Sequence, residues 1–584
     1  MKKTVPADEI WSIAETTPLT ELILEPGGKI TVPPGKQLTL TVDGVHRDLT
    51  PGHYAGNIVL SVTDSIVFDY ENYGQTEQFA MNAALSVQDG KLRKEESVLA
   101  AIQAGSAEDG SAQGVKIRSQ GDNFGGIYVD GTGSYDIYGA DIALDGHGAS
   151  DSVGYGAAIA VRGNSTVTIS DTKIHNVGSI RTALQVCGHG RVEVNDSEFS
   201  AADDDRPNYV KAMSKAPWML GIHGRVRTTN IQDYGEVVYR RCKVTAENWG
   251  AMSTDGTKHV RLTMHDSEIT VTGSGYGAYS IGDCHDLFDH CKIQVPDYGV
   301  IQCSSGLVTF TGGTQVEAGR NAVMMHGAGA PGLLRVDQKS RLHTKGAVFQ
   351  IKGRGGDILV DDAVLDSDAG ILLEIFDNDD PNGRGMHMGP ETVMDVPPGG
   401  FPDGGPGDPI QDEMTAHDGP SAPGGPNGPG PEGPGGPGGL ENRERMEKVY
   451  PVTMQLRNGE YHGHIYHAYS EKNDLILTLD HATLTGCIST TVSSHTQGMP
   501  KAPEQYPLIG RVEHFPCPKD TEFGVHVTLT AGSTWHVAAP SYLTELTILE
   551  GAALSGRMTV NGAEVPIESG TYSGKIVVTP PLMG

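Results

Sequence analysis

Short runs that alternate polar and apolar residues recur through the middle of the chain at a nearly constant spacing. Runs of the form polar-small-polar-apolar start at residues 171, 196, 241, 266, 290, 313 and 362. The steps are 25 (171 to 196, 241 to 266), 24 (266 to 290) and 23 (290 to 313), and 313 to 362 spans two coils. Alternation with a period of two predicts strands, and a fixed repeat predicts a solenoid. Residues 130–380 are therefore predicted to form a right-handed parallel β-helix.

The second position of each repeat is held by a small residue, as an internal stack requires. These residues are Thr172, Ser197, Cys242, Ser267, Cys291, Thr314 and Ala363. The step from 196 to 241 is 45 residues, which is one coil plus an insertion of about 20 residues that leaves the solenoid at a turn.

The two ends of the chain share a different pattern. Residues 52–59 (Gly-His-Tyr-Ala-Gly-Asn-Ile-Val) match residues 570–577 (Gly-Thr-Tyr-Ser-Gly-Lys-Ile-Val), and Leu-Thr-Glu-Leu precedes both, at 19–22 and 543–546. We interpret this match as an internal duplication. Solenoids need atypical end units to cover their open edges, so capping is the modest interpretation. The bolder one is association of the ends, within one chain or between copies in a homo-oligomer.

These patterns divide the chain into five segments. An N-terminal β-rich module (1–80) precedes a parallel β-helix (81–396) that carries the loop insertion at 203–239. A Pro/Gly-rich insertion (397–448) cannot bury apolar surface and is predicted to be disordered. The β-helix continues over 449–540, and a C-terminal β-rich module (541–584) ends the chain.

The coil pattern, which covers about half of the chain, resembles that of the pectin-lyase-like β-helix superfamily. Residues 480–486 (Asp-His-Ala-Thr-Leu-Thr-Gly) and 532–537 (Gly-Ser-Thr-Trp-His-Val) are similar to passenger-type β-helices of surface proteins. The superfamily includes polysaccharide lyases, hydrolases, epimerases, adhesins and phage spikes. The resemblance therefore implies an architecture and does not choose a function.

Charge and composition limit the partners. Lys and Arg number 43 and Asp and Glu 73, a formal charge of −30 that disfavours nucleic acid and anionic membranes. No run approaches the roughly 20 apolar residues that cross a bilayer, and the first residues lack the apolar core of a signal peptide. Seven cysteines without framework spacing agree with a reducing compartment. We expect a cytoplasmic protein, or a secreted or surface protein if a signal precedes Met1.

The insertion contains the strongest candidate site. It supplies an aromatic platform in Trp218, a proton carrier in His223 and two planar fork donors in Arg225 and Arg227, which suit a carboxylate or a developing oxyanion. The alternative is a packed loop whose arginines pair with the Asp-Asp-Asp run at 203–205.

The next coils add an aromatic row. Trp249, Tyr276 and Tyr298 are each followed by glycine and are spaced by 27 and 22 residues, so we expect them to be vertical neighbours. Such a row forms a flat surface on which sugar or phenol rings stack, although solenoids also stack aromatics purely for stability. Further candidates in the same or later turns are Asp255, Tyr279, His326, Lys352 and Arg354.

Resemblance to the superfamily implies two chemistries. Its lyases remove a proton α to a carboxylate with an arginine or lysine, and its hydrolases use paired aspartates. No aspartate pair adjoins the Gly-His-Gly unit at 188–190, which favours β-elimination or isomerisation over hydrolysis. Our first hypothesis is an enzyme acting on a small-molecule or oligosaccharide substrate, a uronate-type sugar or a phenolic. The second is a non-catalytic carbohydrate-binding, adhesin-like or assembly protein.

Roles follow for the named residues. The predicted catalytic residues are His223, Arg225, Arg227 and Tyr279. The predicted substrate-binding residues are Trp218, Trp249, Asp255, Tyr276, His326 and Lys352. A cluster at 284–291 looks like a metal site, but its Cys-x6-Cys spacing is not that of a zinc knuckle and Cys291 fills the small-residue position of the repeat. No cofactor is predicted, and a divalent metal is left open.

Overall fold

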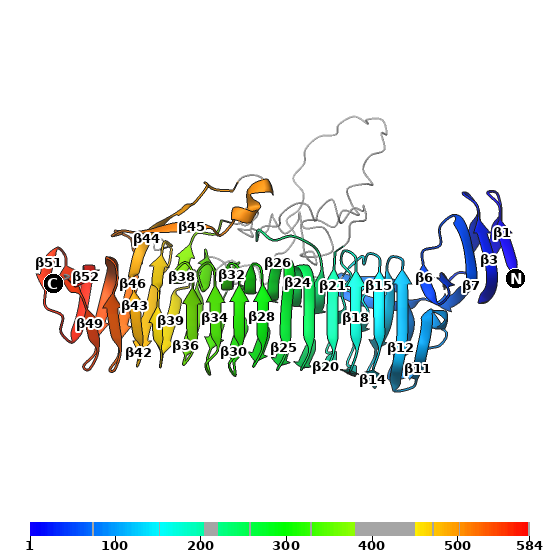
Figure 1. Cartoon of the computed structure of the whole chain (residues 1–584), viewed down its shortest axis with the longest axis horizontal. Coiled ribbons are helices and arrows are strands. Elements are labelled where there is room, and N and C mark those ends of the chain that lie inside the picture. Colours follow the sequence, from blue (N-terminus) through cyan, green and yellow to red (C-terminus); the bar gives the residue numbers. More distant parts are fainter. Residues whose placement is uncertain are drawn as a thin grey trace, which may run out of the picture.

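The structure, a computed structural model, is an elongated and nearly all-β molecule (Figure 1). It describes residues 1–72, 75–150, 152–203, 220–255, 258–327, 330–379, 450–469, 472–500 and 503–581. Within these residues, 46 strands join into one hydrogen-bonded network dominated by parallel pairs, which is consistent with a β-solenoid. Two short 3₁₀ helices, η1 (Leu99–Ala101) and η3 (Pro503–Leu508), accompany them. Trp218 and the segment 397–448 lie outside the described residues.

Each coil contributes three strands, which stack in three rows. Row A comprises β14 (Ser134–Tyr138), β17 (Thr166–Ser170), β20 (Arg191–Asn195), β23 (Glu236–Arg240), β25 (Val260–His265), β27 (Cys284–Asp289), β30 (Leu307–Thr311), β33 (Gly332–Val336), β36 (Gly356–Asp361), β39 (Val452–Arg457), β42 (Leu475–Asp480), β46 (Val525–Leu529) and β48 (Ser541–Ile548). Row B comprises the second half of β12 (Ser111–Gln120), β15 (Asp141–Asp145), β18 (Lys173–Val177), β21 (Glu198–Ala202), the first halves of β24 (Lys243–Asp255) and β26 (Glu268–Ile281), β28 (Lys292–Val295), β31 (Gln315–Ala318), β34 (Arg341–Thr344) and β37 (Val364–Ser367).

The third row, row C, carries the candidate site. It comprises β9 (Gln75–Gln88), β13 (Phe124–Asp130), β16 (Ile159–Val161), β19 (Leu184–Val186), β22 (Arg227–Ile231), the second halves of β24 and β26, β29 (Tyr298–Cys303), β32 (Asn321–His326), β35 (Phe349–Lys352), β38 (Ile371–Phe376), β41 (His464–His467) and β44 (Ile488–His495). A further sheet, next to the end of row B, contains β40 (Glu460–His462), β43 (Thr483–Gly486), β47 (Thr534–Val537) and β49 (Ala553–Ser555). The other strands are β1 (Lys2–Val5), β2 (Ile10–Ser12), β3 (Thr17–Leu24), β4 (Lys29–Thr31), β5 (Lys36–Val42), β6 (Val45–Arg47), β7 (Gly52–Asp64), β8 (Ile66–Asn72), β10 (Lys91–Leu92), β11 (Ile102–Glu108), β45 (Val512–Pro516), β50 (Arg557–Val560), β51 (Ala563–Val565) and β52 (Gly570–Thr579).

The predicted column of small residues is confirmed. All of its members are buried, and several join one coil to the next: the amide of Thr172 donates to Ser197 Oγ (3.0 Å) and that of Cys242 to Ser267 Oγ (3.0 Å). The preceding turn residue is left-handed in several coils, with φ of 50° at Asp171. Aspartate tolerates this conformation better than most residues, which explains its frequency at the first position of the repeat.

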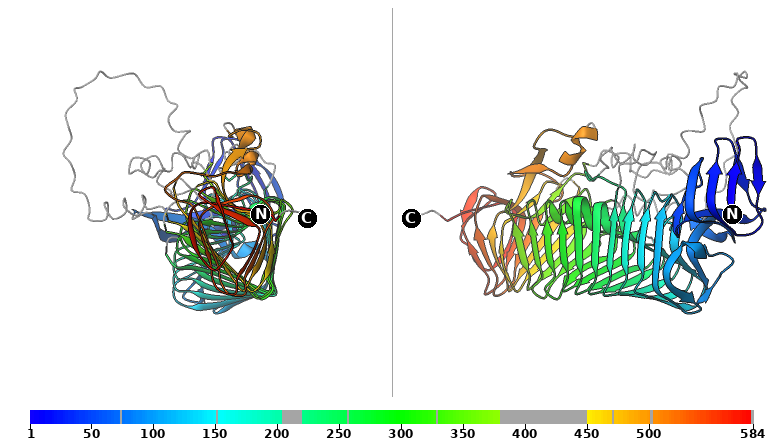
Figure 2. Two further views of the ribbon diagram at one scale, coloured as in Figure 1. Left: turned by 90° about the vertical axis from the view of Figure 1, so that its left-hand side faces the viewer. Right: turned by 45° about the vertical axis from the view of Figure 1, so that its right-hand side comes forward.

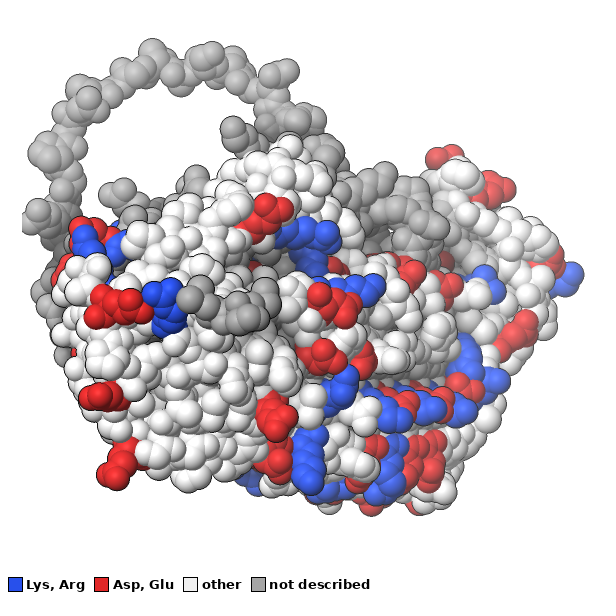
Figure 3. Space-filling model, turned by 60° about the vertical axis from the view of Figure 1, so that its left-hand side comes forward, with Lys and Arg blue, Asp and Glu red and all other residues white. Residues whose placement is uncertain are grey.

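Opposite charges alternate along the outer side of row B. In-register neighbours run Lys116, Asp141, Lys173, Glu198, Lys243, Glu268 and Lys292. Figure 3 shows rows of alternating blue (Lys, Arg) and red (Asp, Glu) side chains on the face in view. Each exposed pair contributes only about 0–1 kcal/mol, but a slip by one coil would place like charges together. The ladder therefore favours one stacking register.

The end modules are duplicated in their hydrogen-bond register. β3 pairs with β7 so that Leu22 faces Tyr54, and β48 pairs with β52 so that Leu546 faces Tyr572. Both pairs are antiparallel and have a register shift at the same place. The two tyrosine hydroxyls each donate to the carbonyl four residues earlier, Tyr54 to Thr50 O (2.7 Å) and Tyr572 to Glu568 O (3.0 Å). The modules lie at opposite ends of the molecule (Figure 1).

Two boundaries differ from the prediction. The coil resumes at Arg227 rather than after Tyr239, because β22 and β23 continue rows C and A in register with β19 and β20. The stretch 449–540 is interrupted by an arm, in which β44 and β45 pair antiparallel and η3 lies between them (Figure 2). None of the helices among the described residues is long and apolar enough to span a membrane.

One carboxyl group lies inside the stack and gives the first prediction. Asp286 in β27 is buried, accepts a hydrogen bond from Thr254 Oγ1 (3.0 Å), and has its pKa raised to about 7 by burial. An unfolded aspartate titrates near about 4. The stability that this group contributes is therefore complete below about pH 4 and is lost as the pH rises through about 7.

Asp286→Asn should therefore raise the free energy of unfolding above pH 7, by about 1–3 kcal/mol, and change little below pH 4. Denaturant titrations at both pH values measure this. Asp266→Asn is the control, because this exposed carboxylate pairs with His290 (2.6 Å) and its neutralisation should stabilise the fold at neither pH. No gain for Asp286→Asn at high pH would contradict the assignment.

Candidate functional site

Row C is the row whose outward face is covered. In rows A and B the inward side chains are buried while the outward ones are partly or fully exposed, whereas β29, β32 and β35 are buried on both faces almost throughout. Two elements lie against the outward face: the segment 220–225, which returns from the insertion, and the arm. Ionisable groups held under them are shielded from water, which strengthens their interactions.

Arg227 and Asp255 form an ion pair at one end of this face. Arg227 Nη1 lies 2.6 Å from Asp255 Oδ2, and the side chains are 3 % and 17 % exposed. Arg227 sits at the start of β22, and Asp255 ends β24, whose second half pairs with β22. A guanidinium that remains charged at this depth can bind a carboxylate or an oxyanion, and Asp255 holds it in place.

Tyr279 lies one coil beyond Asp255 and meets His326, which lies two coils beyond Tyr279. Tyr279 Oη lies 3.1 Å from His326 Nε2, and the rings stack with centroids 6.0 Å apart. Burial raises the pKa of the Tyr279 phenol well above its usual range, and Cys303 and Asp255 raise it further. The phenol therefore keeps its proton and can act as a hydrogen-bond donor or an acid.

Cys303 lies between these groups, one coil before His326 in the same column. Burial raises the pKa of its thiol, and nearby Arg354 and a hydrogen bond with Tyr279 lower it. Arg354 donates to the carbonyls of His326 (2.7 Å) and Ser304 (2.9 Å), so it fixes the backbone on which His326 and Cys303 stand. Sequence reasoning missed Cys303, although the period places it one coil from His326.

Of the two alternatives for the aromatic row, the structure shows packing and not an open surface. Tyr276 and Tyr298 are in register as expected, but Trp249 pairs with Gly275, because the register after the bulge between Ala246 and Asn248 is 26 residues and not the 27 that separate Trp249 from Tyr276. All three aromatics are buried in an apolar cluster with two residues of the returning segment, Leu220 and Ile222. Tyr298 also donates to Leu220 O (3.0 Å). In this structure the row packs the insertion onto the solenoid.

A second polar cluster lies under the arm. Lys352 Nζ is 2.7 Å from Asp379 Oδ1, and both side chains are fully buried. Asp379 Oδ2 also accepts from the amide of Gly510 (2.6 Å) and lies 2.9 Å from His495 Nε2. These contacts hold the pKa of Asp379 below its usual range despite burial. None of these contacts brings Lys352 to Tyr279.

The arm also contacts row C through a second histidine, His514. His514 Nε2 lies 3.3 Å from Glu374 Oε2, and its ring stacks on Tyr466 at 5.1 Å. Gln350 donates to both Glu374 (2.7 Å) and Gly510 O (2.9 Å). No sequence signal could have found the contacts of His514 with Glu374 and of Gln350 with Gly510, because these partners are 140 and 160 residues apart and meet only when the arm folds back.

Arg320 joins the returning segment (220–225) to the arm. Its guanidinium donates to Gly221 O (3.2 Å) in the returning segment and to Pro507 O (2.9 Å) and Ile509 O (3.2 Å) in the arm. Asp297 lies 2.8 Å from Arg320 Nε and holds it there. The two covers are therefore held together above β29 and β32.

The remaining predicted residues are not brought to the Tyr279–His326 pair by the described contacts. His223 is exposed, and its amide donates to Ser274 Oγ (3.1 Å). Arg225 is buried, and its carbonyl accepts from the amide of Ile180 (2.9 Å). Trp218 lies outside the described residues.

The described cysteines and acids show no metal centre. Within the described ranges, no three His, Cys, Asp or Glu side chains converge on a position that could hold a metal ion. Cys291 occupies the small-residue column, where burial raises the pKa of its thiol to about 12. All seven cysteines are free.

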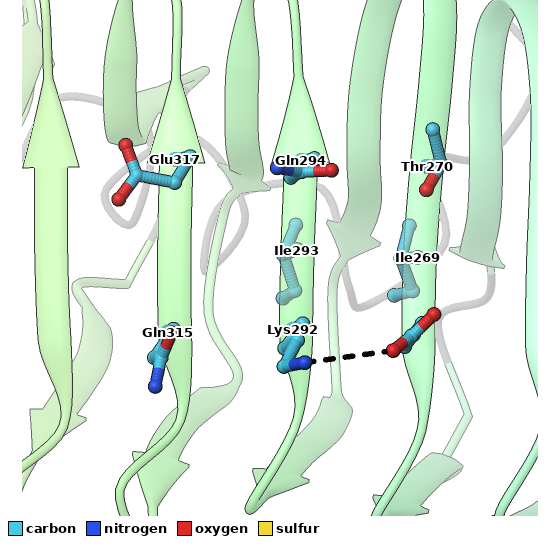
Figure 4. Close-up of a pocket in the computed structure, with 8 residues that line it drawn as sticks. Ile269, Thr270, Lys292, Ile293, Gln294, Gln315 and Glu317 are labelled. Atoms are coloured by element: carbon cyan, nitrogen blue, oxygen red, sulfur yellow. Dashed lines mark ion pairs between the residues drawn. The ribbon is translucent and has the colours of Figure 1, made fainter.

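A shallow groove of about 220 Å³ lies on the outer side of row B (Figure 4). Figure 4 shows Thr270, Gln294 and Glu317 aligned across neighbouring strands. Lys292 on its floor is 3.7 Å from Glu268. The groove is a polar trough between two side-chain columns and holds none of the predicted site residues.

Comparison of the chain with family models, with curated proteins and with solved structures gives no match. The function must therefore be argued from the residues themselves.

The cluster under the arm gives the second prediction. Asp379→Asn leaves Lys352 buried without its carboxylate, a loss that costs about 3–5 kcal/mol for a buried pair. The arm should detach, and hydrogen–deuterium exchange of residues 488–516 should accelerate. Asp368→Asn, which removes an exposed carboxylate 3.3 Å from His343, is the control and should leave the exchange unchanged. Equal protection of the arm in both variants would contradict its proposed attachment.

Proposed function

We propose that the chain is a right-handed parallel β-helix enzyme of the pectin-lyase-like type, acting by acid–base proton transfer on a polyhydroxylated substrate. The proposal rests chiefly on one observation, the 3.1 Å contact between Tyr279 Oη and His326 Nε2 on the covered face of row C. A buried phenol next to an imidazole is a proton-transfer pair, and such pairs gather at functional sites. The free thiols support an intracellular location for the proposed enzyme.

Tyr279 would give a proton and His326 would restore it. The raised pKa keeps the phenol protonated at neutral pH, so Tyr279 serves as the acid toward an oxygen or carbon of the substrate. A protonated imidazole at the other side of the hydrogen bond then passes its proton to the phenolate. In the reverse direction Nε2 of a neutral imidazole accepts the phenol proton while the phenol oxygen takes a proton from the substrate, as isomerisation or β-elimination requires.

Arg227 would hold the anionic part of the substrate. Its guanidinium is fixed by Asp255 at 2.6 Å, and the Arg227 and Asp255 charges both act on the Tyr279 phenol. A carboxylate or an enolate oxygen bound at Arg227 would therefore lie close to the proton donor. A uronate-type sugar or a hydroxylated phenol fits this arrangement of one cation, one acid and one imidazole.

A second candidate function is non-catalytic binding of a carbohydrate along row B. It is favoured by the open groove, whose Thr270, Gln294 and Glu317 could hydrogen-bond successive hydroxyl groups of an extended chain.

The test measures proton transfer without knowing the product. The wild-type protein is incubated in D₂O with a panel of uronates and hydroxylated phenols, and deuterium incorporation at carbon is followed by NMR. We expect incorporation with at least one compound. Tyr279→Phe and His326→Gln should each slow it by about 100-fold or more, the usual contribution of a positioned acid or base.

Tyr239→Phe is the matched control. Tyr239 is a buried tyrosine inside the stack whose hydroxyl bonds Thr229 Oγ1 (2.7 Å), so the variant loses one buried hydrogen bond outside the site. It should melt like Tyr279→Phe and keep full exchange activity. Absence of incorporation with every compound, or equal loss in the control, would refute the proposed site.

A further inference from the structure

The two end modules are one structural unit used twice, strand for strand. β1 and β3 pair in the same parallel register as β46 and β48, so Lys3 faces Leu22 as Val527 faces Leu546. β2 and β4 likewise match β47 and β49, and Trp11 is the counterpart of Trp535. β5, β6 and β7 match β50, β51 and β52, so His46 corresponds to Glu564. Each unit thus has two faces. One is the first-coil edge, formed by β1 and β2 or by β46 and β47. The other is the cap face, the far side of the antiparallel strands β5–β7 or β50–β52.

The first-coil edge is buried in the C-terminal copy. β46 and β47 pair with β42 and β43 of the preceding coil. Val527 and Ser533 are 1 % exposed, and Ser533 Oγ donates to Leu479 O (2.9 Å). Trp535 is fully buried and donates from Nε1 to Gly486 O (3.1 Å). This edge is therefore built to receive a coil.

The same edge of the N-terminal copy carries an ion pair. Lys3 stands at the inward position of Val527 and Glu9 at that of Ser533, and the two side chains pair with each other. Lys3 Nζ also lies 5.2 Å from the centre of the Trp11 ring. No described strand pairs with this edge of β1 or β2, and Met1 and Ile10 are more than 60 % exposed.

The cap face shows the opposite distribution. In the N-terminal copy it is buried against the solenoid: His46 Nδ1 lies 2.8 Å from Ser119 Oγ, and its ring stacks on Phe124 at 4.1 Å. Thr39 there accepts from Asn82 (3.1 Å). In the C-terminal copy, Arg557 replaces Thr39 and Glu564 replaces His46. These two side chains are exposed and bond to each other at 2.9 and 3.1 Å.

We propose that both outer end faces are latent interfaces between copies of this chain, each closed by an ion pair. At each end the pair, Lys3–Glu9 or Arg557–Glu564, replaces residues that pack in the other copy. Docking a second molecule would remove these charges from water, and inward charges on an open sheet edge are a known barrier to pairing. Without the Lys3–Glu9 pair, the first-coil edges of two copies meet across a two-fold axis and bury Met1, Ile10 and Trp11.

The test opens the N-terminal edge of the full chain. Lys3→Val/Glu9→Ser installs the residues of the C-terminal copy, and sedimentation velocity across a concentration series measures self-association. We expect a dimer that forms at a concentration at least about tenfold below that at which the wild type associates. Lys173→Val/Glu198→Ser, the same substitutions at an exposed ion pair in the middle of row B (4.0 Å), is the control and should stay like the wild type.

Two outcomes would overturn the proposal: a folded Lys3→Val/Glu9→Ser variant that remains monomeric, or a control that associates equally. Circular dichroism and melting temperature establish folding. If that variant does not fold, Arg557→Thr/Glu564→His at the other end decides by the same measurement. Its dimerisation supports the proposal, and a folded monomer refutes it.

Discussion

The structure depends on one constraint, the parallel backbone register that places each residue directly above its counterpart one coil earlier. In a ladder of this kind, equivalent side chains of successive coils lie one strand spacing apart. The residues in each column must therefore pack against one another. Inside, this selects small residues whose hydroxyls bond the amide of the neighbouring coil, as Ser197 bonds Thr172. Outside, it selects alternating charges, as along Lys173, Glu198 and Lys243. The same rule explains why the ends need special residues, since a ladder that satisfies itself is equally ready to accept another coil.

This periodicity is also what made the fold readable from the sequence. The spacing of the repeats and the inner small column were predicted because they depend on residues one coil apart, and the duplicated ends because their sequences match. The structure confirms the column, and the two end modules pair alike. The aromatic row was misread by one position because the coil advances by 26 residues here, from Trp249 to Gly275, one fewer than the spacing of Trp249 and Tyr276, and no average period gives the length of a single coil. The insertion was predicted too long because β22, Arg227–Ile231, lacks the polar alternation that marks rows A and B.

The site was harder to predict, for a physical reason. A strand that is buried on both faces lacks the alternation of polar and apolar residues. The sequence alone therefore does not show which row of strands is covered by another segment. Arg227 was found because it lies in the insertion that breaks the period, and Asp255, Tyr279 and His326 because they lie in the coils that follow it. The contacts of His495 with Asp379 and of His514 with Glu374 span 116 and 140 residues and arise only when the arm folds back.

The covered face also explains why chemistry is better placed in row C than on the outer ladders. The exposed pairs of row B are screened by water and contribute little to stability, so their main effect is on the stacking register. Under the returning segment and the arm, burial is the largest cause that raises the pKa of Tyr279, Asp255 raises it further and Arg227 lowers it. His326 Nε2 lies 3.1 Å from the phenol oxygen. A solenoid offers many equivalent positions, and the cover is what makes one of them different. The insertion returns as a cover over row C, through Leu220 and Ile222, and Arg227 stands at the start of the coil that it rejoins.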